Sequence, residues 1–141
     1  MKIYFSCSLT GGRDDEKVYG LIVDHLISCG HKVLTAHLAR PEVMEAEKVV
    51  DANEVYRRDM NWVEECDAFI AEVSTPSHGV GYEIAYALVL GKPVLCCYRQ
   101  GVTVSKMILG NDSDTIALAA YDIDAGIVAI VDNFLDGLQT F

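Results

Sequence analysis

Short apolar segments alternate with longer segments of helical periodicity along the 141 residues of the chain. Segments rich in β-branched and other apolar residues predict five strands, at 2–7, 32–36, 68–73, 93–98 and 115–121. Apolar residues spaced three and four positions apart predict helices between them, at 15–30, 52–67, 79–91 and 125–138, with a further short helix within 41–50. Strands that are apolar on both faces and alternate with helices are typical of a parallel sheet covered on both sides. We therefore predict one domain, residues 1–141, with a doubly wound, flavodoxin- or Rossmann-like α/β fold of five parallel strands and helices on both faces.

The composition narrows the class of protein. A formal net charge of −10 argues against a nucleic-acid polymer as partner, because such a surface needs a basic stripe. No apolar run approaches the roughly 20 residues of a membrane span, and "MKIYFSCSL" enters a strand pattern without the cleavage region of a secretion signal. We therefore expect a cytoplasmic protein without a membrane segment.

The five cysteines, at positions 7, 29, 66, 96 and 97, show no C-x-x-C spacing. An odd number without paired spacing indicates reduced, mostly buried thiols rather than a disulfide framework or a zinc site. Cys96 and Cys97 are neighbours on a predicted strand and should point to opposite faces of the sheet. We expect no metal ion and no cofactor.

In a doubly wound fold, ligands bind beyond the carboxyl ends of the strands, where the strand order reverses. The loop "SLTGGRDD" follows the first strand and places Arg13 after two glycines and before a helix. Backbone N–H groups at a helix start attract anions, and an arginine supports this. The alternative is a plain turn with a solvated arginine and a helix cap from Asp14 or Asp15.

The segment "TPSHGVGYE" after the third strand is more specific. Ser77 either caps the following helix or donates to a phosphate, and Gly79 and Gly81 permit close approach of a ligand to the backbone. Glu83 is predicted in the first turn of that helix, where the helix dipole would keep it ionised, as a carboxylate nucleophile requires. Its alternative role is only to complement the dipole.

A carboxylate nucleophile needs a second group that manages protons, and Asp59 in "YRRDMNW" is the candidate. Two carboxylates roughly 5 Å apart suit a retaining displacement at a sugar carbon, whereas a surface ion pair with Arg57 or Arg58 is the alternative. Tyr4 either belongs to the core or orients Glu83. Three further loop residues have a structural and a ligand-binding interpretation: His37, His78 and Ser105.

Together these motifs resemble the 2'-deoxynucleoside 5'-phosphate N-hydrolases of the nucleoside 2-deoxyribosyltransferase superfamily. The resemblance runs from "IYFSCSLTGGRDD" through "RRDMNWVEECDAFIAEVSTPSHGVGYEIAYA" to "GKPVLCCYR" and "VSKMI". It implies that Glu83 attacks the anomeric carbon, that Asp59 assists departure of the base and attack by water, and that Tyr4 hydrogen-bonds the nucleophile. It also implies a homodimer in which Ser105 reaches the phosphate in the neighbouring subunit's site. The expected substrate-binding residues are Ser77, Gly79, Gly81, Ser105, Met107, Arg13, Thr10, Phe5 and His37.

Three positions depart from the family pattern: Cys7 where glycine is usual, Thr10 in place of an arginine that lines the pocket, and His78 where leucine is frequent. They surround the base and phosphate positions and bear on substrate choice. The leading interpretation is a deoxynucleoside-monophosphate N-hydrolase. The alternatives are an N-hydrolase of CMP or a modified pyrimidine ribonucleotide, a deoxyribosyltransferase, and a nucleotide-binding module without catalysis. A pure binding module has no use for Tyr4, Asp59 and Glu83 together.

Overall fold

Five parallel strands form one sheet, in the order β2–β1–β3–β4–β5, in the computed structural model, which describes residues 1–139. This confirms the predicted five-stranded parallel α/β sheet. The strands are β1 (Lys2–Ser6), β2 (Lys32–Val33), β3 (Ala68–Glu72), β4 (Val94–Arg99) and β5 (Ile116–Tyr121). The order reverses once, because β2 lies on one side of β1 and all later strands lie on the other.

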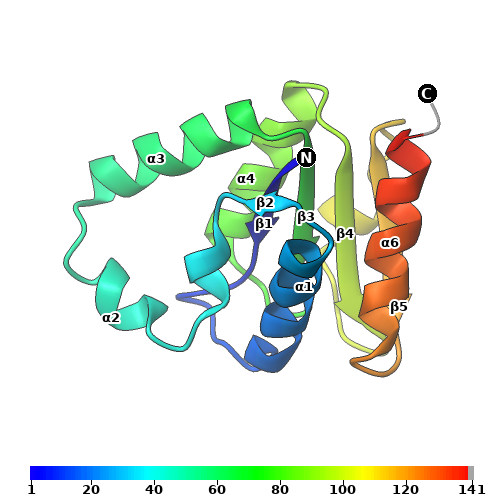
Figure 1. Ribbon diagram of the computed structural model, residues 1–141, viewed down its shortest axis with the longest axis horizontal. Helices are drawn as coiled ribbons and strands as arrows, with labels where there is room; N and C mark the ends of the chain where they lie inside the picture. The colour runs from blue at the N-terminus through cyan, green and yellow to red at the C-terminus, as the bar shows by residue number, and fades with distance from the viewer. Residues whose placement is uncertain (140–141) are drawn as a thin grey trace.

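Helices cover both faces of the sheet, as predicted (Figure 1). On one face α1 (Glu16–Ser28) packs beside α6 (Gly126–Gln139), and on the other α3 (Ala52–Glu65) lies beside α4 (His78–Val89). Three shorter helices join them: η1 (Ala36–Ala39), α2 (Val43–Glu47) and α5 (Lys106–Leu109). None of the helices in residues 1–139 combines the length and the apolar character that crossing a membrane requires.

The second strand is shorter than its sequence predicts, ending at Val33 rather than at 36. A side chain takes over the pairing at Thr35, whose hydroxyl donates to the Phe5 carbonyl at 2.6 Å and accepts from the Phe5 N–H at 2.9 Å. Because one hydroxyl satisfies both backbone groups, the chain leaves the sheet there and turns into η1.

Two apolar cores fill the space between the sheet and its helices. Cys97 belongs to the core under α1 and α6, and Cys96 to the core under α3 and α4, so the expected opposite orientation of these neighbours is confirmed. Tyr4 stacks on Phe69 in the second core, with ring centroids 5.1 Å apart. Four cysteines are buried and Cys29 is exposed, and all five are free thiols, as expected.

Candidate active site

The strand order reverses between β1 and β3, and the loops that follow these two strands press against each other. A Cβ atom on Gly11 would lie 2.2 Å from the Pro76 carbonyl oxygen, so no other residue fits there without moving the backbone. Gly12 has a φ of +121°, a conformation that favours glycine. Both glycines of "TGGR" therefore have a structural role, which is to let the two loops meet at the carboxyl end of the sheet.

Buried polar contacts tie the loop between β3 and α4 to the far strands. Glu72 is completely buried and accepts hydrogen bonds from the Ser74 hydroxyl and, at 2.9 Å, from the Tyr121 hydroxyl. The Ser74 oxygen in turn accepts from the Arg99 N–H at 2.7 Å. Burial raises the pKa of Glu72, and the bonds from Ser74 and Tyr121 oppose this. Because a buried carboxylate is costly unless it is hydrogen-bonded, these bonds fix the position of the loop.

Helix α4 begins one residue earlier than predicted, with Ser77 as its cap. The Ser77 oxygen accepts from the Val80 N–H at 3.4 Å, so the capping interpretation of this serine is confirmed. Glu83 is the sixth residue of the helix, and no acidic residue lies in the first turn. The prediction that the helix dipole keeps Glu83 ionised is therefore wrong, because that effect is confined to the first turn.

The Glu83 side chain extends from α4 to the carboxyl end of β1, where it is partly buried. The Ser6 hydroxyl donates a hydrogen bond of 2.5 Å to its carboxylate. Burial raises the pKa of Glu83 to about 7, while Ser6 and Tyr4 lower it and the charge of Asp59 raises it further. Two effects therefore oppose each other at this carboxyl group: burial favours the neutral form, and the nearby hydroxyl groups favour the charged form.

Tyr4 lies on the same side of β1 as Ser6, two residues away, and its hydroxyl is completely buried. Burial raises its pKa, and so does the neighbouring charge of Glu83. Within residues 1–139 the Tyr4 hydroxyl has no hydrogen-bond partner. The Ser6 hydroxyl is the group that donates to Glu83. The proposed orienting bond from Tyr4 stays a prediction.

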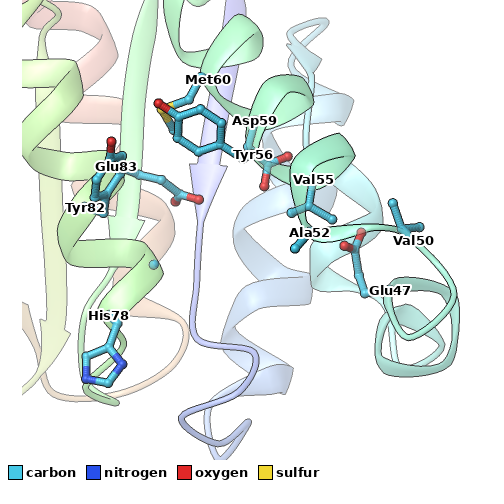
Figure 2. Close-up of a pocket in the computed structure, with 11 residues that line it drawn as sticks. Glu47, Val50, Ala52, Val55, Tyr56, Asp59, Met60, His78, Tyr82 and Glu83 are labelled. Atoms are coloured by element: carbon cyan, nitrogen blue, oxygen red, sulfur yellow. The ribbon is translucent and has the colours of Figure 1, made fainter.

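Asp59 faces Glu83 from α3. Both carboxylates project into the space between α3 and α4 (Figure 2). The Arg58 guanidinium donates to Asp59 at 2.8 Å and to Glu47 at 3.0 Å. The expected ion pair with an arginine is thus present, but Asp59 is buried rather than on the surface. Burial raises its pKa, and the hydrogen bond and charge of Arg58 oppose the rise.

The two acids line one cavity of about 630 Å³ at the reversal point. Its wall is largely apolar, and two exposed tyrosines, Tyr56 and Tyr82, meet edge to face with ring centroids 6.3 Å apart. The full lining is Glu47, Val50, Ala52, Val55, Tyr56, Asp59, Met60, His78, Gly79, Tyr82 and Glu83. Two carboxyl groups with different environments in an apolar cleft are suited to divide nucleophilic and acid–base roles.

Four of the predicted substrate-binding residues line a second cavity, of about 690 Å³, namely Ser77, Gly81, Ser105 and Met107. His78 lines both cavities, and the other α4 residues that line them differ, so the two cavities lie against different faces of this helix. Ser105 caps α5 by accepting from the Met107 N–H at 3.2 Å. Capping uses the oxygen as an acceptor, so the O–H of each capping serine remains available to donate to an anion. A Cβ atom at Gly81 would meet nothing within 4 Å, so packing inside the chain does not require this glycine.

A fifth predicted substrate-binding residue, Gly79, lines the cavity of the two acids, and the remaining four line neither cavity. His37 contacts Glu47 at 3.2 Å. The Arg13 guanidinium donates to the Leu38 carbonyl at 3.0 Å, and so ties its loop to η1. Phe5 is buried in the core under α1, and Thr10 is exposed. These four assignments stay predictions.

Three polar residues of this region were not predicted from the sequence as site residues. The sequence pattern places Ser6 within a strand, and a serine among apolar strand residues is the signal that could identify it. Ser8 is completely buried, and its hydroxyl has no hydrogen-bond partner within the described residues. Asp15 occupies the cap position of α1, one of the two residues named for it in the alternative interpretation, but its carboxylate makes no capping hydrogen bond and instead accepts from the Arg99 guanidinium at 2.6 Å.

A parallel α/β sheet with two carboxyl groups in one cavity at the reversal point has its candidate site where open α/β proteins bind ligands, and carries the pair of acids that glycosidases use. Residues 3–129 match the family model described as nucleoside 2-deoxyribosyltransferase. The chain therefore belongs to the nucleoside 2-deoxyribosyltransferase family, as the sequence motifs predict.

Two relatives and one solved structure extend this finding. The chain is 40% identical over 136 residues to a Methanosarcina mazei protein that carries the provisional name 2'-deoxynucleoside 5'-phosphate N-hydrolase 1, covering 96% of this chain and 84% of the relative. It is 42% identical over 112 residues to the 5-hydroxymethyl-dUMP N-hydrolase of Rattus norvegicus, covering 77% and 68%. The CMP N-glycosidase of Clostridium botulinum shares the fold, with a TM-score of 0.70 at 17% identity over 94% of this chain and 99% of that one.

Proposed function

We propose that the chain hydrolyses the N-glycosidic bond of a 2'-deoxynucleoside 5'-monophosphate, releasing the free base and deoxyribose 5-phosphate. The observation that carries the proposal is the pair Glu83 and Asp59, which face one apolar cavity at the reversal point of the sheet. The names of relatives about 40% identical to the chain support the same chemistry.

The proposed reaction proceeds in two displacements at C1' of the sugar. The Glu83 carboxylate attacks C1', the bond from C1' to the base nitrogen breaks, and protonated Asp59 gives its proton to the leaving base. Asp59, now ionised, removes a proton from water, which attacks C1' and releases Glu83. The raised pKa of Asp59, caused first by its burial, favours the protonated start of this cycle. Tyr4 orients the nucleophile.

The phosphate end of the substrate is assigned to the start of α4. The Ser77 hydroxyl and the backbone around Gly79 and Gly81 would bind the 5'-phosphate there, since helix starts favour anions. Gly79 lines the cavity of the acids and Gly81 lines the second cavity, and both glycines lie in the first turn of the same helix. A carboxylate therefore faces C1' while the donors face the other end of the sugar.

A homodimer belongs to this proposal, with Ser105 donated to the neighbouring subunit's phosphate site. It is supported by large apolar side chains exposed on α4, α5 and β5, which contact with a second copy would bury. Met107 is 85% exposed and Val89 is 84% exposed. Three leucines in this group are also exposed: Leu90, Leu109 and Leu118.

The direct test is incubation with a panel of nucleoside and deoxynucleoside monophosphates, followed by chromatography for free base. We expect base release from at least one deoxynucleoside monophosphate and much less from the matching nucleoside. Release from CMP alone would instead support the ribonucleotide alternative. The family model favours one second candidate, a deoxyribosyltransferase, for which a free acceptor base would yield a new nucleoside faster than water yields free sugar phosphate. Absence of base release from every member of the panel would contradict the proposed function.

Replacement of Ser6 by alanine should change the pH dependence of hydrolysis. The Ser6 hydroxyl donates to ionised Glu83 and lowers its pKa. Because attack requires the ionised carboxylate and departure of the base requires protonated Asp59, kcat/KM should follow a bell-shaped pH profile, with Glu83 setting the acidic limb and Asp59 the alkaline limb. Loss of the bond should move this acidic limb to higher pH, with the deficit largest at pH 6 and small near pH 9. Ser28→Ala, on the exposed end of α1, is the control. An unchanged profile in Ser6→Ala would mean that Glu83 ionisation does not limit the rate.

Ser77→Ala and Ser105→Ala should each weaken nucleotide binding about tenfold, since a hydrogen bond to a charged group contributes roughly 1.5–3 kcal/mol. Unphosphorylated nucleosides should be affected much less. The measurement is KM and product release for both substrate types.

Mixed dimers of Glu83→Ala and Ser105→Ala chains test whether Ser105 acts across the interface. The site that retains Glu83 takes its Ser105 from the Glu83→Ala partner, so nucleotide affinity at that site should return to that of the unaltered protein. Within one chain Ser77 and Ser105 line the same cavity. The contrary result is therefore that both serines bind the phosphate in their own subunit. No recovery after verified subunit exchange means that Ser105 serves its own chain.

A further inference from the structure

A group of potential metal ligands lies far from the acid pair, between α1 and α6. His25, Cys29 and Asp132 each present one ligand atom, and these three atoms all lie within 4.8 Å of one another. His25 and Cys29 are four residues apart at the end of α1, so they share one face of that helix. Asp132 comes from α6, which packs beside α1 (Figure 1). The group therefore bridges two elements more than 100 residues apart in sequence.

The contacts converge on a single nitrogen atom. The Asp132 carboxylate lies 2.6 Å from His25 Nε2, and the Cys29 sulfur lies 3.7 Å from the same Nε2. In a catalytic relay the thiol and the carboxylate occupy opposite nitrogens of the imidazole ring. Here both lie at one nitrogen, which excludes that arrangement and is the geometry of ligands that surround a common point.

The separation of sulfur and nitrogen matches the bond lengths of zinc, and that of nitrogen and carboxylate is shorter. Bonds of about 2.3 Å to sulfur and about 2.0 Å to nitrogen, at a tetrahedral angle, place the two ligand atoms about 3.5 Å apart, close to the observed 3.7 Å. The carboxylate would need to move back by less than 1 Å from Nε2, by the same bond lengths. Its side chain is 48% exposed and is free to do so, whereas His25 is 21% exposed and fixed between the helices.

We propose that His25, Cys29 and Asp132 form a site for Zn²⁺ or a similar transition-metal ion, with water completing the coordination. Thiolate, imidazole and carboxylate are all zinc ligands, and three protein ligands with one open position is an established form of site. Binding replaces the proton of the Cys29 thiol and the Nε2 proton that His25 shares with Asp132. The ion would clamp the end of α1 to α6.

This site is independent of the proposed hydrolysis. Helix α1 ends at Ser28 just before β2 begins at Lys32, so the group lies toward the amino edge of the parallel sheet. Glu83 binds Ser6 at the carboxyl end of β1. Cysteine spacing does not indicate this site, because only one of its ligands is a cysteine and the third ligand comes from a distant helix.

The exposure of the cysteines gives a sharp assay. Cys29 is exposed and the other four are buried, so a thiol reagent such as DTNB should modify one cysteine rapidly in the native protein. We expect Zn²⁺ to slow this modification at least tenfold in tag-free protein. His25→Ala and Asp132→Asn should remove most of the protection. Asp136→Asn, one turn further along the exposed side of α6, is the matched control and should retain it.

Cobalt gives a second readout that does not depend on thiol reactivity. Co²⁺ should produce a thiolate-to-metal absorption band that is absent in Cys29→Ser. Saturating Zn²⁺ should also raise the Tm by about 5 °C, because a ligand that binds only the folded state stabilises it. Equal protection in the two ligand variants and the control would overturn the proposal, as would unchanged modification at millimolar zinc. Hydrolysis should be the same in Cys29→Ser and the unaltered protein, so this test succeeds or fails separately from the proposed function.

Discussion

Glu83→Gln should abolish base release while nucleotide binding stays largely intact. The amide has nearly the same shape but no charge with which to attack C1', so the covalent step is lost. The Ser6 hydroxyl can still donate to the amide oxygen, which keeps the cavity in place. The measurement is kcat together with nucleotide affinity by calorimetry. Glu54→Gln, at an exposed position near the start of α3, is the matched control and should have normal activity.

The same substitution should stabilise the fold at neutral pH. Burial raises the pKa of Glu83 to about 7 in the folded state, against an ordinary value of 4.5. The folded state therefore binds more protons than the unfolded state between these values, and stability falls as pH rises from 4.5 through 7. A neutral glutamine avoids this cost, which we put at about 1 kcal/mol after allowance for partial exposure. Full activity in Glu83→Gln would remove the nucleophile from the account.

Asp59→Asn should lower kcat by roughly 10² to 10⁴, the usual contribution of general acid–base catalysis. The loss should be smaller for a substrate whose base is a better leaving group, because such a base needs less protonation as it departs. The variant also removes the ion pair of Asp59 with Arg58, so folding must be checked by the Tm. Asp112→Asn, in an exposed loop, is the control. A rate within a few-fold of the unaltered protein for all leaving groups would leave Asp59 with a structural role only.

The fold was accessible from the sequence because its determinants are local and periodic. Runs apolar on both faces identified buried parallel strands, and even the opposite orientations of Cys96 and Cys97 followed from strand geometry. The end of β2 was not accessible, because it depends on Thr35 finding the backbone of Phe5 across the sheet. Such a contact has no signature in the sequence around position 35.

The site divides in the same way. Within one motif, Ser77 is correctly predicted as the cap of α4, whereas Glu83 is correctly predicted on that helix but too close to its start. Interactions between distant segments were missed, notably the Ser6 hydrogen bond to Glu83 across 77 positions. The charge state of Glu83 was misjudged for the same reason, because burial by surrounding elements decides its pKa and its helix position does not. Sequence motifs thus identify the two acids, whereas their hydrogen bonds and pKa values depend on how the surrounding elements pack.

The covalent intermediate offers the most direct test of the central claim. Asp59→Asn protein should be mixed with a deoxynucleoside monophosphate whose base is a good leaving group, because the variant lacks the acid of the first step as well as the base of the second. The mixture should be quenched within one turnover and digested for mass spectrometry. Because the variant lacks the base that activates water, hydrolysis of the glycosyl-enzyme should be slow, and the sugar-phosphate ester on the protein should accumulate. We predict that the peptide containing Glu83 gains the mass of deoxyribose 5-phosphate less one water, in proportion to the base released. Base release in a single turnover without any adduct, or with an adduct on another residue, would contradict the account.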